Sequence, residues 1–192
     1  MNVDKREIYR YLGYQGRVPD ENVLREVDRC LEELREAVTP RFVYRQYPIE
    51  RFFTDNIERP FLDEKPGAEL LSIAGMKIQS RSLCRNLRDC KSAYLMAATL
   101  GIGPDRLIAR ASVAKMSRAV ILQAAAAAMI EAWCDEVNQK IIKEAEDQGL
   151  YCRPRFSPGY GDFSLEYQKD FAQILRIQKE IGVYLTQSLL KM

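Results

Sequence analysis

A glycine-rich segment of the sequence holds the residues best suited to bind an anion. In RFSPGYGD, residues 155–162, Arg155 stands three residues before Pro158-Gly159-Tyr160, and a second glycine follows. An arginine offers a planar fork of hydrogen-bond donors to a carboxylate or phosphate. The two glycines permit positive φ, which lets main-chain groups approach a ligand closely. The segment therefore predicts an anion-recognising turn with the ring of Tyr160 beside it.

The same segment also has a purely structural interpretation. Pro-Gly-Tyr-Gly-Asp is typical of a connection between a strand and a helix, with Asp162 as the helix cap and Tyr160 as a packing residue. Glycine-rich turns of this kind are common in loops. The residues alone leave both interpretations open.

Glu131 is a second candidate ligand residue. It lies seven residues after Ala124, four after Ala127 and three before Cys134. These offsets place the carboxylate on or beside the apolar stripe of a helix, where it needs a partner if it is buried. The alternative is a residue at the boundary of the stripe that reaches water.

The inventory of reactive residues excludes several kinds of site. The chain has no histidine, so it supplies no Ser-His-Asp triad, no Cys-His pair and no imidazole ligand for zinc, haem or cobalt. The five cysteines are Cys30, Cys84, Cys90, Cys134 and Cys152. They are scattered and form no C-x-x-C pair, which favours buried thiols in a reducing compartment over a metal cluster at Cys84, Cys90 and Cys152. We predict no metal ligands.

The overall composition is that of an ordinary globular protein. The 192 residues suit one domain over 1–192, and the formal charge of +2 is too near balance for a general polyanion binder. Arg81, Arg85 and Arg88 recur at helical spacing before Lys91, which we interpret as a solvated helix face. We therefore expect no nucleic-acid partner.

The N-terminal sequence MNVDKREIYRYLGY lacks the apolar core of a signal peptide. No window of the chain offers the roughly 20 apolar residues of a membrane span. We expect a cytoplasmic protein without a membrane partner.

Helical and strand patterns alternate irregularly along the chain. Three- and four-residue spacing predicts helices over 4–12, 20–38, 80–90, 105–147 with a break near 111–113, and 165–182. Apolar and β-branched runs predict strands over 41–49, 92–99, 150–156 and 183–190, with a connection over 50–67. The mixture, without a βαβ repeat, predicts an α+β fold: a twisted, largely antiparallel sheet with long helices packed against it.

Several uncommon sequence elements of the C-terminal half occur together. They are Arg155 with Pro158-Gly159-Tyr160, then Ile181-Gly182, then Leu185-Thr186 and Ser188. In this order and spacing the chain resembles the activation (reactivation) domain of vitamin B12-dependent methionine synthase, closest to the small stand-alone proteins related to that domain. The run YLMAATLG and the alanine-rich helix ending in MIEAW also fit, so the likeness is best over residues 75–192. It is weaker over the helical N-terminal part, 1–48.

This resemblance implies an activation domain-like fold and a binding site for S-adenosylmethionine. The family's motif arginine, which holds the methionyl part of the ligand, matches Arg155. In the family, main-chain groups two and four residues after this arginine also form hydrogen bonds with the ligand. These positions match Ser157 and Gly159. The motif tyrosine, which faces the ligand and the corrinoid, matches Tyr160, and a ligand-binding helix glutamate matches Glu131.

The resemblance also implies a role in methionine biosynthesis. An inactive cob(II)alamin on a partner's corrinoid-binding domain is reduced by an external donor, such as a flavodoxin- or ferredoxin-like protein, and is remethylated from S-adenosylmethionine. Cobalamin enters only through that partner. The chain contributes positioning, so we predict no catalytic residue in the strict sense.

The chain departs from the family pattern in two places. Family members usually continue past the LT-x-S strand into a further strand with a ligand-contacting tyrosine, whereas this sequence ends at Lys191-Met192, which implies a truncated C-terminal end. An acidic residue near the start of the family's domain has only Asp55 and Asp63 as candidate matches. Two other functions therefore stay open: a non-catalytic interaction module of the same fold, and an activator of another corrinoid methyltransferase, such as those acting on methylamines or aryl methyl ethers.

Overall fold

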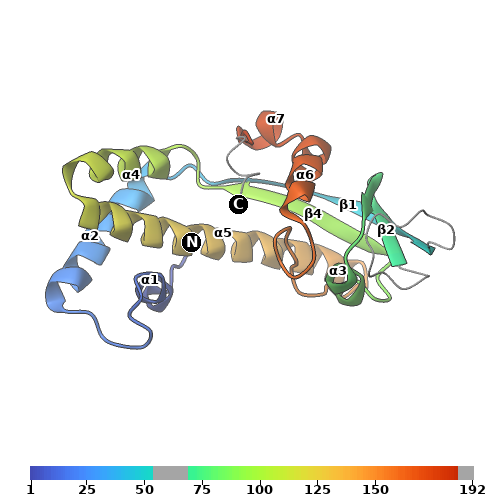
Figure 1. Ribbon diagram of the computed structural model, residues 1–192, viewed down its shortest axis with the longest axis horizontal. Coiled ribbons are helices and arrows are strands. Elements are labelled where there is room, and N and C mark those ends of the chain that lie inside the picture. Colours follow the sequence, from blue (N-terminus) through green and yellow to red (C-terminus); the bar gives the residue numbers. More distant parts are fainter. Residues whose placement is uncertain (54–68, 186–192) are drawn as a thin grey trace, which may run out of the picture. The chain divides into compact units, whose positions relative to one another are not determined.

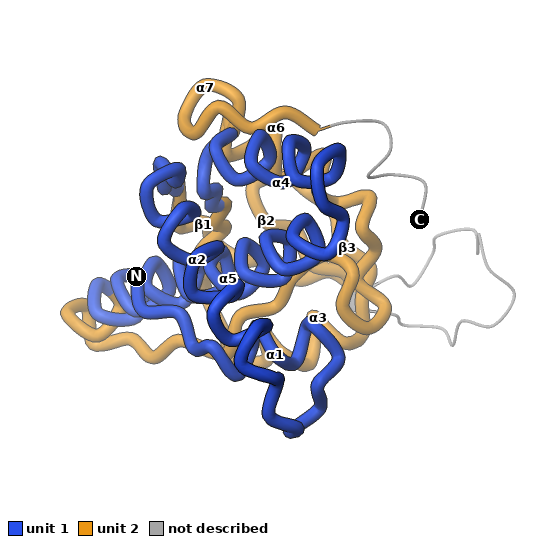
Figure 2. The backbone as a smooth tube through the Cα atoms, turned by 90° about the vertical axis from the view of Figure 1, so that its left-hand side faces the viewer, with its two compact units in different colours: residues 1–42, 98–144 blue, residues 43–97, 145–192 orange. Residues whose placement is uncertain are grey.

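The computed structural model describes residues 1–53 and 69–185 (Figure 1). The chain divides into two compact units (Figure 2). Unit 1 comprises residues 1–42 and 98–144, and unit 2 comprises residues 43–97 and 145–192. The prediction of one domain over 1–192 stays a prediction, and each unit is described below by itself.

Unit 1 is helical. It contains α1 (Lys5–Tyr11), α2 (Glu21–Ala37), α4 (Gly103–Ala114) and most of α5 (Met116–Asp147). The predicted helix over 20–38 is confirmed: the side chain of Asp20 accepts hydrogen bonds from the main-chain N–H groups of Asn22 and Val23 and so caps α2. The predicted break in the 105–147 helix is found at Lys115, which is extended between α4 and α5.

The core of unit 1 is formed where α2 and the first part of α5 bury their apolar stripes. Val27, Leu31 and Leu34 of α2 are buried together with Ala125 and Met129 of α5. The periodicity of these residues in the sequence dictates this burial, because positions three and four apart share one face of a helix.

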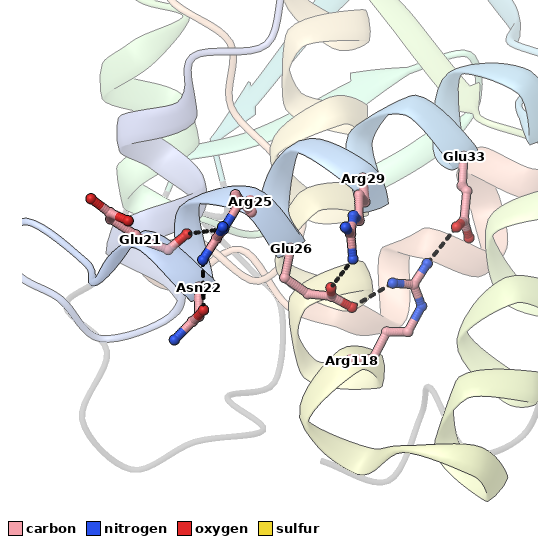
Figure 3. Close-up of polar contacts among 7 residues, drawn as sticks. All are labelled: Glu21, Asn22, Arg25, Glu26, Arg29, Glu33 and Arg118. Atoms are coloured by element: carbon pink, nitrogen blue, oxygen red, sulfur yellow. Dashed lines mark hydrogen bonds and ion pairs between the residues drawn. The ribbon is translucent and has the colours of Figure 1, made fainter.

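An arginine of α5 ties that helix to α2. The guanidinium of Arg118 pairs with the carboxylates of Glu26 and Glu33, the latter at 2.5 Å (Figure 3). The two hydrogen-bonded carboxylates raise the pKa of Arg118 above its ordinary value. Nearby, burial raises the pKa of the Cys30 thiol to about 11. Cys30 is therefore a protonated core residue at neutral pH.

Unit 2 is built on a four-stranded sheet with the order β3-β2-β1-β4. The strands are β1 (Arg41–Phe53), β2 (Glu69–Ile73), β3 (Met76–Ile78) and β4 (Ser92–Thr99). β1 and β2 pair antiparallel with Ile49 opposite Ile73, and β2 and β3 pair antiparallel with Leu71 opposite Ile78. The α+β class with an antiparallel sheet is thus confirmed, and the likeness to an activation domain stays a prediction.

Three short helices bury the apolar side chains of this sheet. They are α3 (Arg81–Asn86), α6 (Gln168–Leu175) and α7 (Ile177–Ile181). Leu83, Leu175 and Ile181 from these helices are buried in one cluster with Leu71 and Ile78 of the sheet. The apolar faces of α3, α6 and α7 therefore supply the second core of the chain.

The prediction of a strand over 150–156 is wrong. Residues 151–157 have no regular secondary structure, although their composition is typical of a strand. Pro154 has no N–H to give to a sheet, and its carbonyl instead accepts a hydrogen bond of 3.3 Å from the side-chain amide of Asn86. The segment thus lies along α3 and outside the sheet.

Two further strand boundaries differ from the prediction. The strand predicted over 41–49 continues to Phe53, so the predicted connection over 50–67 begins as strand, and its remainder lies outside the described residues. The hairpin of β2 and β3 was not predicted, because β3 has only three residues, too few for its alternation of buried and exposed side chains to indicate a strand. The predicted strand over 92–99 is confirmed as β4, in which Leu95 is buried and the other side chains are half-buried.

The predicted helix over 165–182 is interrupted. A 3₁₀ turn (Leu165–Tyr167) leads into α6, and Arg176 adopts a left-handed conformation, with φ at +52°, between α6 and α7. Residues 183–185 of the predicted final strand form no strand, and the rest of that prediction lies outside the described residues. No helix in the described ranges is long and apolar enough to cross a membrane.

Candidate functional site

Main-chain hydrogen bonds close residues 157–163 into a compact loop. We name this loop, together with Arg155 and Phe156 that lead into it, the glycine turn. The N–H of Tyr160 donates to the carbonyl of Ser157 at 3.1 Å, and the N–H of Phe163 donates to the carbonyl of Tyr160 at 3.0 Å. A third bond, from the N–H of Gly159 to the carbonyl of Phe163 at 2.6 Å, joins the middle of the turn to its C-terminal end. The turn is therefore held by its own backbone, independently of most of its side chains.

Both glycines of this turn are required by its geometry. Gly159 has φ at +100° and Gly161 has φ at +58°, conformations that other residues rarely adopt. A Cβ added at Gly161 would stand 2.7 Å from the hydroxyl oxygen of Ser82 in α3. The second glycine thus lets the turn lie directly against the start of α3.

Asp162 fastens the glycine turn to α3. Its carboxylate accepts hydrogen bonds from the Ser80 hydroxyl at 2.7 Å and from the N–H groups of Arg81 at 2.7 Å and Ser82 at 3.0 Å. Asp162 therefore caps α3, a helix that begins about 80 residues earlier in the sequence. The interpretation of Asp162 as the cap of the following helix is wrong, because the Ser164 side chain accepts from the N–H of Glu166 and caps that turn.

The pKa of Asp162 reflects these contacts. Desolvation raises the pKa of this carboxyl, but the hydrogen bonds from Ser80, Ser82 and Arg81 outweigh that effect and hold the pKa well below its usual range. Because the folded-state pKa is depressed, the stabilisation is present above the unfolded pKa of about 3.9 and is lost as the pH falls through the folded-state value.

Replacing Asp162 by alanine is expected to lower the free energy of unfolding at pH 7 by about 1 kcal/mol, the usual cost of losing a helix cap. The variant should also lose less stability than the parent when the pH is lowered from 5 toward 2. Urea denaturation at several pH values measures both effects. Asp147→Ala, at the exposed end of α5, is the matched control and should behave as the parent does. An equal acid response in parent and Asp162→Ala would contradict this role.

An aromatic cluster supports the glycine turn from the core side. Phe163 is 2% exposed and packs against the rings of Phe156, Tyr167 and Phe171, with centroid distances of 6.3, 5.2 and 6.4 Å. Tyr160 is 66% exposed, and its ring lies 6.3 Å from that of Phe156. Tyr160 therefore packs against Phe156 on one side, as the structural interpretation expected, and the turn presents most of its ring to solvent.

The structure brings four of the five predicted site residues together. Arg155, Ser157, Gly159 and Tyr160 all belong to the glycine turn of unit 2, and the side chains of Arg155 and Tyr160 are exposed. The main-chain groups of Ser157 and Gly159 that we predicted as ligand contacts include one carbonyl and one N–H already used within the turn. Their remaining main-chain groups, the Ser157 N–H and the Gly159 carbonyl, are the candidates for ligand contact.

Glu131, the fifth predicted residue, belongs to unit 1, where it lines a cavity of about 310 Å³. This volume is at the lower end of the range for small-molecule pockets. The cavity lies between the N-terminal segment with α1 and the middle of α5. Its lining residues are Asn2, Asp4, Glu7, Tyr11, Ala128, Glu131, Ala132, Asp135, Glu136 and Gln139.

The lining of this cavity is strongly acidic. Five of its residues carry carboxylates, and no Lys or Arg is among them. On the α1 side, the side-chain hydrogen bond from Arg6 lowers the pKa of Asp4, and Glu7 pairs with Arg10 at 2.6 Å. Small side chains, Ala128 and Ala132, flank Glu131 on α5 and leave the space open. Glu136 pairs with the N-terminal ammonium at 2.9 Å, so three of the five carboxylates are already balanced by a cation.

Sequence reasoning missed Tyr11 and Asp135 as lining residues. Asp135 follows Glu131 by four positions, so the helical spacing could have indicated that both carboxylates share one face of α5. Tyr11 gave no such signal, because its place beside α5 depends on long-range packing of α1. Across residues 1–53 and 69–185, no group of three Cys, Asp or Glu side chains is arranged to hold a metal ion.

Comparison with known proteins leaves the family open. No family model matches the chain, and no curated protein matches its sequence. The resemblance to the methionine synthase activation domain therefore rests on the motif residues alone.

Proposed function

We propose that this chain binds S-adenosylmethionine and serves as a reactivation component for a cobalamin-dependent methyltransferase. The methyltransferase that we propose first is methionine synthase. The observation that carries the proposal is the glycine turn. It holds Tyr160 on a backbone that is closed by its own hydrogen bonds and fixed to α3 through Asp162, and Arg155 lies two residues before the first of these bonds. Such a pre-organised loop loses little conformational entropy when a ligand binds.

The chemistry of the ligand agrees with the groups that the turn offers. S-Adenosylmethionine carries a carboxylate, which the guanidinium of Arg155 would bind through two parallel hydrogen bonds. Its sulfonium would find an aromatic face in the exposed ring of Tyr160. When bound, the ligand would supply an electrophilic methyl group. The part of the chain is to bind and orient it.

Glu131 lines the acidic cavity of unit 1, so its role in ligand binding is tested separately from that of the glycine turn. The amino group and the sulfonium of S-adenosylmethionine are both cationic, and the carboxylate of Glu131 is the residue that the family likeness assigns to this ligand. The side chain of Glu131 is exposed, so solvent screens part of the attraction between its carboxylate and a cation. The resemblance implies that Glu131 binds the ligand, and the variant below tests this residue of unit 1 by itself.

Glu131→Gln should therefore weaken S-adenosylmethionine binding by about 1 to 3 kcal/mol, since the amide keeps the shape of the side chain and removes its charge. Isothermal titration calorimetry measures the change. Glu144→Gln, an exposed glutamate on the same helix α5 that does not line the cavity, is the matched control. Equal affinities of the two variants would remove Glu131 from the site.

The function itself is tested with a partner protein. The full chain is mixed with the cobalamin-loaded corrinoid domain of a methionine synthase, a one-electron reductant and S-adenosylmethionine labelled in its methyl group. Transfer of the label to the cobalamin, dependent on this chain, is the expected result. Ligand binding without transfer would favour the non-catalytic interaction module, and transfer only to the corrinoid protein of a methylamine or aryl methyl ether system would favour an activator of that system.

A further inference from the structure

Four exposed arginines of unit 2 lie on two neighbouring segments. Three of them recur at positions i, i+4 and i+7 of α3 and its end, so they share the solvent side, opposite the buried Leu83. The fourth is on the irregular segment 151–157. We name these residues the arginine face: Arg81, Arg85, Arg88 and Arg153.

Hydrogen bonds hold the two segments of the arginine face side by side. The guanidinium of Arg153 donates to the carbonyl of Arg88 at 3.4 Å, and the amide of Asn86 donates to the carbonyl of Pro154 at 3.3 Å. At the other end of α3, Asp162 accepts from the N–H of Arg81. The segment thus runs along α3 in the opposite direction and brings Arg153 next to Arg88.

The charge of this face is not balanced by ion pairs within residues 1–53 and 69–185. In the part of the chain that the structure describes, the four arginines form no ion pair with a carboxylate, unlike Arg118 in unit 1. The carboxylate of Asp162 is already bonded to the start of α3. Among the residues between Arg81 and Lys91, the only acidic one is Asp89, so cations dominate the surface.

We propose that the arginine face is the docking surface for a protein partner that presents acidic side chains. Charge complementarity indicates an acidic partner, since guanidinium groups that form no ion pair can bind carboxylates through two parallel hydrogen bonds. Tyr151 lies beside Arg153 in the sequence and is 92% exposed. Arginine and tyrosine are the residue types enriched at protein interfaces, whereas lysine is depleted there.

The charge of the whole chain favours a protein over a nucleic acid as the partner. The formal charge is +2, which gives no general attraction to a polyanion. The arginine face is local and suits a limited acidic patch on a folded partner.

The proposed docking surface shares no residue with the proposed ligand site. The arginine face excludes Arg155 and Tyr160, so its variants leave the proposed S-adenosylmethionine contacts in place. A loss of docking with intact ligand binding, or the reverse, therefore identifies which of the two proposals has failed.

The test uses the full chain and two anionic probes of equal charge, a glutamate-only peptide and a single-stranded oligothymidine. Binding is measured by fluorescence anisotropy at an ionic strength of about 0.05 M, where surface charges are weakly screened. The variant Arg85→Glu/Arg88→Glu removes the centre of the arginine face. Its matched control is Arg106→Glu/Arg110→Glu on the exposed side of α4, which changes the net charge by the same amount.

We expect the peptide to bind the parent and the α4 control alike and to bind Arg85→Glu/Arg88→Glu at least about tenfold more weakly. Equal weakening in both double variants would overturn the inference, since binding would then follow net charge. Tighter binding of the oligothymidine than of the peptide, or no binding of the peptide to the parent, would overturn it as well. If Arg85→Glu/Arg88→Glu fails to fold by circular dichroism, Arg153→Glu on the irregular segment replaces it and must give the same loss.

Discussion

Arg155→Ala is expected to weaken the binding of S-adenosylmethionine by about 2 to 4 kcal/mol, the cost of removing one partner of a charge pair that becomes desolvated in the complex. This corresponds to a loss of affinity between roughly thirtyfold and several hundredfold. The loss should be local, because main-chain hydrogen bonds hold residues 157–163 and Asp162 fixes them to α3.

The matched control for this variant is Arg153→Ala, two residues earlier on the same exposed segment. It removes the same charge from nearly the same place and should leave the affinity for S-adenosylmethionine within a factor of about three, since a surface charge that does not contact the ligand is screened by solvent. Tyr160→Phe should also cost little, because it keeps the aromatic face. If Arg155→Ala binds as tightly as Arg153→Ala, Arg155 does not hold the ligand.

Phe163→Ala is expected to lower the free energy of unfolding by about 3 to 5 kcal/mol, as is usual when a buried phenylalanine is truncated. The ring is 2% exposed and contacts three other aromatic rings, so its removal leaves a cavity that its neighbours cannot fill without moving. The midpoint of urea denaturation measures the effect, with an unchanged slope if the unfolding remains two-state.

The control for Phe163→Ala is Tyr160→Ala in the same turn. That ring is 66% exposed, so its removal should change the free energy of unfolding by no more than about 0.5 kcal/mol. A similar loss of stability in both variants would mean that the aromatic cluster does not anchor the turn through Phe163.

The elements that the sequence predicted best are those in which local periodicity and burial agree. α2 repeats its apolar residues at three and four positions behind the cap Asp20, and β4 is a short apolar run that ends at a glycine. The strand prediction for residues 150–156 was wrong because their aromatic and apolar side chains indicate a strand, while Pro154 and the side chain of Asn86 place the segment along α3. That contact joins residues 68 positions apart, and no local pattern reports it.

The residues of the candidate site also differ in whether the sequence could predict their place. Arg155, the two glycines and Tyr160 could be predicted as one turn, because they are neighbours in the sequence and glycine at these positions has a direct conformational meaning. The role of Asp162 could not be predicted, since its partners at the start of α3 lie about 80 residues away. The α1 side of the acidic cavity was hidden for the same reason: its approach to α5 is a property of the folded unit.

The most direct test of the proposed function is calorimetric titration of S-adenosylmethionine into the 192-residue protein. We predict saturable binding, with affinity retained in Arg153→Ala and lost in Arg155→Ala. Absence of saturable binding to the parent protein, with the chain folded by circular dichroism, would contradict it.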